Sequence, residues 1–121
     1  MMPARHACGW IDIREEIAGI QGLTKDADLG AFSASWGMKR AVEHGLLIIA
    51  EAAKHLPQSM KDARPEVPWS KIHGLGNLLR HEYRHVDPGV LWSIVTGQLD
   101  DLDNAAAALL ENLDEAGSRD V

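Results

Sequence analysis

The segment formed by residues 69–88 concentrates the side chains that could do chemistry. It reads WSKIHGLGNLLRHEYRHVDP. On a helix with about 100° per residue, five nitrogen-rich side chains share one face: His73, Asn77, Arg80, His81 and Arg84. Imidazole can transfer protons near pH 7, and guanidinium can hold a phosphate by two hydrogen bonds. This face is therefore either an ordinary solvated surface or a site for an anionic substrate.

Tyr83 falls on the opposite side of the same helix, with Ile72, Leu75 and Leu79. An amphipathic tyrosine can pack its ring in the core while its hydroxyl reaches the surface. The alternative is a buried tyrosine with a purely structural role.

Residues 81–85 also satisfy H-E-x-x-H, the pattern in which two histidines one turn apart bind zinc. Arg84 would place a cation between the two ligands, which a metal dication disfavours. Residues 86–121 contain no histidine that could act as a third ligand. We therefore predict no metal site and keep a zinc hydrolase as a remote alternative.

Charge is unevenly distributed along the chain. The 121 residues carry a net charge of −6, and residues 100–121, with seven carboxylates and one arginine, account for all of it. Residues 54–85 are locally basic, with six lysines and arginines against three acidic residues. The acidic total therefore does not exclude RNA, although it predicts weak long-range attraction to phosphate.

The elements that must position this segment are helices. Apolar residues recur every three or four positions, which predicts helices over residues 10–20, 38–56, 69 to about 86, 91–94 and 99–113. Gly22 is expected to end the first helix, and Thr24 or Asp26 to cap a turn within the connector 23–32. Pro57 ends the second helix, and residues 57–68 form a loop with at most a short helical turn.

These features predict one all-α domain over residues 1–121, built as a four- to five-helix up-down bundle. Residues 114–121 are expected to form a flexible acidic tail. A single cysteine, Cys8, excludes an internal disulfide, and no apolar run is long enough to span a membrane. Without a signal-peptide pattern, the expected location is the cytoplasm.

Several segments in order resemble the HepT-like branch of the HEPN superfamily, the higher-eukaryote and prokaryote nucleotide-binding helical domain. The resemblance covers about residues 10–113. The segments that carry it are 49–53, Pro68-Trp69, 74–83, Val86-Asp87 and 90–95.

This resemblance implies a helical bundle, usually a symmetric homodimer, that acts as the toxin of a toxin–antitoxin pair. The family's members are metal-independent ribonucleases without a cofactor. Their motif is an arginine, four residues, a histidine, one residue and a tyrosine. Carried over, His81 is the catalytic histidine, Asn77 the polar residue after the motif arginine, and Tyr83 the motif tyrosine. The implied partner is a minimal nucleotidyltransferase (MNT) antitoxin, which transfers AMP to Tyr83 and blocks the RNA site.

The motif arginine should stand at position 76, where this chain has Gly76. Arg80, one turn further along, would replace its charge, or Arg80 and His85 would reproduce the arginine–histidine spacing four residues later. We prefer the first reading because His81 keeps its partner Tyr83. The alternative is a non-catalytic subunit that still binds a nucleotidyltransferase. Gly76 could also simply allow another helix to approach closely.

We therefore assign His81, Arg80 and Asn77 to catalysis by attack of the RNA 2′-hydroxyl, with His81 as general base or acid. Arg84, His73 and Lys71 are assigned to RNA binding. Glu51, in an otherwise apolar helix, is expected either to pair with Arg80 or to face solvent. The four tryptophans are expected to pack in the core or a dimer interface rather than to stack on RNA.

Overall fold

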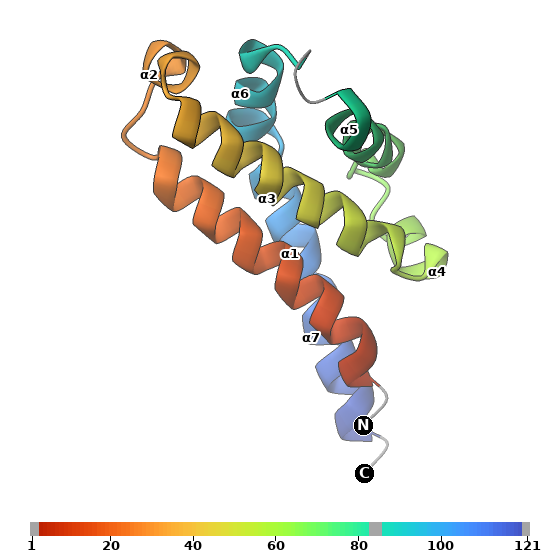
Figure 1. Ribbon diagram of the computed structural model, residues 1–121. Coiled ribbons are helices and arrows are strands. Elements are labelled where there is room, and N and C mark those ends of the chain that lie inside the picture. Colours follow the sequence, from red (N-terminus) through yellow and green to blue (C-terminus); the bar gives the residue numbers. More distant parts are fainter. Residues whose placement is uncertain (1–2, 83–85, 120–121) are drawn as a thin grey trace.

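The computed structural model describes the backbone of residues 3–82 and 86–119, and the side chains of residues 8–82 and 86–112 (Figure 1). Within these residues the fold is entirely helical, as predicted, with seven helices rather than four or five. They are α1 (Pro3–Thr24), α2 (Leu29–Ala34), α3 (Trp36–Lys54), α4 (Gln58–Asp62), α5 (Trp69–Glu82), α6 (Pro88–Gly97) and α7 (Leu99–Arg119).

The long helices α1 and α3 lie side by side and run in opposite directions, and α7 packs on another side of α1 (Figure 1). Helix α5 packs on α3, and α6 lies beside α2 and α7. The predicted stripe of α1 is confirmed, because Trp10, Ile13, Ile17 and Ile20 are all buried. Helix α3 contacts α1, α2, α5 and α6, which explains its unusually wide apolar surface.

The start of α5 is held by tryptophans. The Nε1 of Trp69 donates to the carbonyl oxygens of Lys61 at 2.9 Å and Arg64 at 3.1 Å. The Trp10 ring meets Trp69 edge-on, with 5.8 Å between centroids, and its Nε1 lies 3.3 Å from the sulfur of Met60. These contacts fasten α4 and the connector 63–68 against α1 and α5, and α4 itself is the short helical turn expected in this loop.

The other two tryptophans differ from each other. Trp92 packs on Phe32 with 5.3 Å between ring centroids, as expected for a core residue. Trp36 is 70% exposed, and the Arg40 guanidinium lies 5.7 Å from its ring centroid. Trp36 is therefore not a core residue of this chain, and its packing in a dimer interface stays a prediction.

Two predicted boundaries are wrong in the first connector. Helix α1 continues past Gly22 to Thr24, whose hydroxyl donates to the carbonyl of Ile20 at 2.8 Å. The residue that caps α2 is Asp28, which accepts from the Ala31 amide at 2.8 Å, rather than Thr24 or Asp26. A side-chain oxygen at this position satisfies an amide that the first helical turn leaves unpaired.

The C-terminal helices are longer than predicted. Asp87 caps α6 by accepting from the Gly89 amide at 2.8 Å, and α6 extends over ten residues. Helix α7 continues from Leu113 to Arg119, through most of the segment assigned to an acidic tail. None of the described helices combines the length and apolar character that crossing a membrane requires.

Acidic residues near the start of α7 bind α1. Asp103 accepts from Arg14 at 2.9 Å, and Asp100 accepts from Gln21 at 2.8 Å. The hydrogen bond and charge of Asp103 raise the pKa of the Arg14 guanidinium above its ordinary value. Part of the chain's negative charge is therefore used to join two helices.

Candidate functional site on helix α5

Helix α5 has one face on α3 and one face in solvent. Gly76 and Leu79 are buried, with Ile72 and Leu75 half-buried beside them. The predicted nitrogen-rich residues lie on the other side and are exposed: His73, Asn77, Arg80 and His81. Side chains four residues apart on a helix are neighbours, so His73, Asn77 and His81 form one continuous row. The predicted site residues Tyr83 and Arg84 lie outside the described residues.

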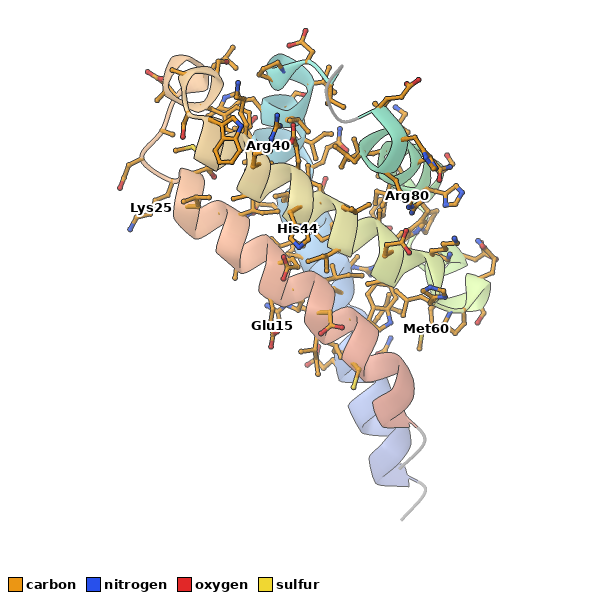
Figure 2. The ribbon with its side chains drawn as sticks, in the orientation of Figure 1. Glu15, Lys25, Arg40, His44, Met60 and Arg80 are labelled. Carbon is orange, nitrogen blue, oxygen red and sulfur yellow. The ribbon has the colours of Figure 1, made fainter. Side chains whose placement is uncertain are left out.

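Arg80 connects this row to α3. Its guanidinium forms an ion pair with the carboxylate of Glu51, and its Nη1 donates to the Asn77 side-chain oxygen at 2.8 Å. Figure 2 shows Arg80 where α5 adjoins α3, so it lies at the edge of the exposed face. The predicted pairing of Glu51 with Arg80 is confirmed. Because a carboxylate already neutralises part of its charge, Arg80 is a weaker phosphate ligand than a free arginine would be.

Gly76 marks the closest approach of α5 to α3. A Cβ atom built on Gly76 would lie 2.6 Å from the Cβ of Ala50, a distance that carbon atoms without a bond do not adopt. The close-packing role of Gly76 is therefore confirmed. A side chain at the position of the family's motif arginine would have to push the two helices apart or displace Ala50.

Two of the residues assigned to RNA binding, His73 and Lys71, lie on different surfaces. His73 lines a groove between α3, α4 and the start of α5, whereas Lys71 lines an apolar cavity between α5, α6 and α7. The two residues therefore face opposite sides of α5. A strand of RNA lying along the row from His73 to His81 would pass away from Lys71.

The groove beside His73 also holds two lysines that sequence reasoning did not assign to a site. Lys54 comes from the last turn of α3 and Lys61 from α4. Both belong to the basic segment 54–85, so the charge signal was present in the sequence. Their position was not predictable, because it depends on how α4 is folded back onto Trp69.

The zinc alternative rests on two histidines, of which His81 is exposed and His85 lies outside the described residues. Among the side chains that the structure describes, no three histidine, cysteine, aspartate or glutamate residues gather in a way that could hold a metal ion.

Comparison with known proteins gives one family. The family model described as "Ribonuclease HepT-like" matches residues 13–109. The protein named "Putative RNase MJ1380" from Methanocaldococcus jannaschii is 36% identical over 84 residues, covering 69% of this chain and 77% of its own length. The "Probable ribonuclease HepT" of Thermococcus cleftensis is also 36% identical over 84 residues, covering 69% of this chain and 76% of its own.

A longer match at lower identity is "Putative RNase MJ0125" of M. jannaschii, 27% identical over 94% of this chain and 99% of its own length. No solved structure was found to match the chain. The matched residues 13–109 include α3, α5 and the whole row from His73 to His81. This chain therefore belongs to the HepT-like ribonuclease family.

Proposed function

We propose that this protein is a metal-independent endoribonuclease whose reactive histidine is His81. One observation carries the proposal: the match to the HepT-like ribonuclease family spans the segment around His81, and His81 is exposed at the end of α5. An exposed imidazole beside Asn77 and Arg80 can reach a bound RNA strand without any rearrangement of the core.

In the proposed reaction, the RNA 2′-hydroxyl attacks the adjacent phosphorus and loses its proton. The bond from phosphorus to the 5′-oxygen breaks, and the leaving oxygen takes up a proton, which leaves a cyclic phosphate and a free 5′-hydroxyl. His81 is suited to one of these two proton transfers. The amide of Asn77 and the guanidinium of Arg80 would stabilise the negative charge that builds up on the phosphoryl oxygens.

We extend the proposal to a symmetric homodimer, because one copy offers a single histidine at the motif position, His81, whereas the reaction needs both a base and an acid. Two copies of His81 facing one another would supply a base and an acid from different chains. Mixed dimers of wild-type and His81→Ala chains test this arrangement. Loss of activity in the mixed dimer is expected, and full activity of a monomer would contradict it.

By its family resemblance, the protein would be the toxin of a toxin–antitoxin pair, with an MNT antitoxin as partner. The antitoxin would attach AMP to Tyr83, two residues after His81. The added phosphate would repel RNA and occupy space beside the reactive histidine. Mass spectrometry of the co-expressed pair should find AMP on Tyr83, and an unmodified Tyr83 together with full inhibition would contradict this mode of control.

The nuclease proposal is tested by incubating purified protein with RNA in EDTA. The wild type should cleave, and His81→Ala should lose cleavage. His44→Ala is a matched control, because His44 is also exposed but lies on α3 away from α5 (Figure 2). Equal cleavage by His81→Ala and the wild type would refute the assignment, and activity that disappears in EDTA would favour metal-dependent hydrolysis.

A second candidate is a non-catalytic subunit that binds a nucleotidyltransferase. The specific observation in its favour is Gly76, which packs on Ala50 where the family's motif has an arginine. The charge of the nearest replacement, Arg80, is paired with Glu51. Absence of RNA cleavage at any protein concentration, together with a stable complex with the transferase, would favour this reading.

A further inference from the structure

The groove between α3, α4 and α5 is positively charged and lies outside the residues proposed for catalysis. It has a volume of about 360 Å³ and is called the α4 groove here. Lys54, Gln58, Lys61, Trp69 and His73 line it, together with two alanines of α3. Two ammonium groups and an imidazole surround an apolar floor of alanine and tryptophan, and no carboxylate lines it.

Three acidic residues of the adjoining segments, Glu51, Asp62 and Glu66, do not line the groove. Asp62 accepts from Gln58 at 2.9 Å, Glu66 pairs with Arg64 at 3.2 Å, and Glu51 pairs with Arg80. Among the described side chains, Lys54 and His73 have no hydrogen-bond or ion-pair partner. Asp62 adjoins the groove through Gln58, but no described carboxylate pairs with Lys54 or His73.

The walls of the groove are fixed before any ligand arrives. The Nζ of Lys61 donates to the carbonyl of Ala53 at 3.1 Å, which ties α4 to the end of α3. Trp69 donates to two carbonyl groups on the opposite wall, at Lys61 and Arg64. Met60 of α4, seen at the lower right in Figure 2, contacts Trp10 of the core. Because α4 is already held in place, binding in the groove does not have to order this helix.

The groove continues the row of polar side chains on α5. His73 lines the groove, and Asn77 and His81 follow it at intervals of four residues. Eight residues of helix span about 12 Å. At ~3.4 Å for each stacked nucleotide of a strand, this distance corresponds to roughly three to four nucleotides.

We propose that the α4 groove binds the phosphodiester backbone of RNA several nucleotides away from the cleaved bond. Lys54 and Lys61 would contact phosphate, and the apolar floor beside Trp69 would accept a sugar or base edge. Grooves that follow a single strand in this way combine cationic rims with aromatic surfaces. The inference deepens the nuclease proposal and rests on it for the direction of the strand.

The test measures binding to the full chain by fluorescence anisotropy, with a labelled eight-nucleotide 2′-O-methyl RNA in EDTA. Methylation removes the attacking hydroxyl, so binding is measured without cleavage. Lys54→Gln should weaken binding several-fold and lower the slope of log affinity against log salt by about one. Lys54→Glu should weaken it further, and because Lys54 ends α3, circular dichroism of both variants verifies the fold.

Lys25→Gln and Lys25→Glu are the matched controls. Lys25 is exposed, and it lies at the opposite edge of the molecule from Arg80 and Met60 (Figure 2). Because its charge is screened over that distance, both variants should keep the wild-type affinity within about twofold. A dinucleotide that can occupy only the His81 end should bind wild type and Lys54→Gln equally.

Equal losses in the Lys54 and Lys25 variants would overturn the proposal, because they would show only an effect of net charge. Binding of AMP that depends on Lys54, without such dependence for the RNA, would assign the groove to a free nucleotide and also overturn it. The nuclease proposal fails separately. If Lys54→Gln loses RNA binding while the wild type does not cleave RNA, the groove proposal stands and the nuclease proposal is refuted.

Discussion

Two glycines in α5, Gly74 and Gly76, should respond in opposite ways to the same substitution. Both lie inside the helix and differ by only two positions. A methyl group on Gly74 would meet nothing within 4 Å, whereas one on Gly76 would lie 2.6 Å from the Cβ of Ala50. We therefore predict that Gly74→Ala stabilises the protein and that Gly76→Ala does not.

The size of the effect follows from two terms. Replacing glycine by alanine in a helix interior favours folding by about 1 kcal/mol. Carbon atoms in contact lie about 3.5–4.0 Å apart, so α3 and α5 must separate by roughly 1 Å to admit the methyl of Gly76→Ala. Overpacking of this kind destabilises by about 1–3 kcal/mol. Gly76→Ala should thus lose between roughly 0 and 2 kcal/mol, and Gly74→Ala should gain about 1.

Ala50→Gly provides the compensating change. Alone it should destabilise by about 2 kcal/mol, because it loses helix propensity and one buried methyl group. In the double variant Ala50→Gly/Gly76→Ala, the methyl group only moves from one helix to the other. The double variant should therefore be more stable than the sum of the single changes predicts, with a coupling of about 2–4 kcal/mol.

The assay is urea unfolding of the four variants followed by circular dichroism, with thermal melts in parallel. At this chain length, 1 kcal/mol corresponds to about 3–5 °C in Tm. Stabilisation of Gly76→Ala equal to that of Gly74→Ala would refute the close contact between α3 and α5. Simple additivity of Ala50→Gly and Gly76→Ala would refute it independently.

Two further predictions concern the site. Glu51→Gln should tighten binding of the 2′-O-methyl RNA, because it frees the charge of Arg80. Glu15→Gln makes an equal change of net charge on α1 and should leave binding unchanged. Both partners of the Glu51–Arg80 pair are more than a third exposed, so Glu51→Gln should lower the free energy of unfolding by less than about 1 kcal/mol. Ala50→Gly/Gly76→Arg should raise the rate of RNA cleavage in EDTA by up to about 100-fold, because it restores a cation for the transition state, whereas Gly76→Arg alone should be less stable than the wild type. An unchanged rate in a folded double variant would show that the missing arginine does not limit activity.

The helices of this fold were predictable where burial has a clear period. The stripe of Trp10, Ile13, Ile17 and Ile20 identified α1, because a helix packed on one side repeats its apolar residues every three or four positions. The cap of α2 was not predictable in the same way. Thr24, Asp26 and Asp28 all carry suitable oxygens, and the choice of Asp28 depends on where tertiary packing starts the helix.

In the candidate site, too, features within one helix were predictable and features that depend on the packing of several helices were not. The exposed row on α5 was predictable, because one helix fixes the spacing of His73, Asn77 and His81. The α4 groove was not, because Lys54, Lys61 and His73 come from three helices that meet only when Trp69 binds the carbonyls of α4 and its connector. Similarly, the sequence left several explanations for Gly76, and its contact with Ala50 depends on how α3 and α5 pack.

The missing arginine and the position of Glu51 have connected consequences. With no side chain at Gly76, α5 rests directly on Ala50, and the next residue of α3, Glu51, comes within reach of Arg80 one turn later. The carboxylate of Glu51 then partly neutralises the charge of Arg80, so Arg80 attracts RNA less strongly. In the proposed arrangement that attraction must come from elsewhere, and the α4 groove offers the ammonium groups of Lys54 and Lys61. RNA binding and RNA cleavage would thus depend on different residues, because the α4 groove would bind the strand and His81 would transfer the proton during cleavage. Lys54→Gln should therefore raise the KM for long RNA and leave the kcat unchanged, whereas His81→Ala should lower the kcat.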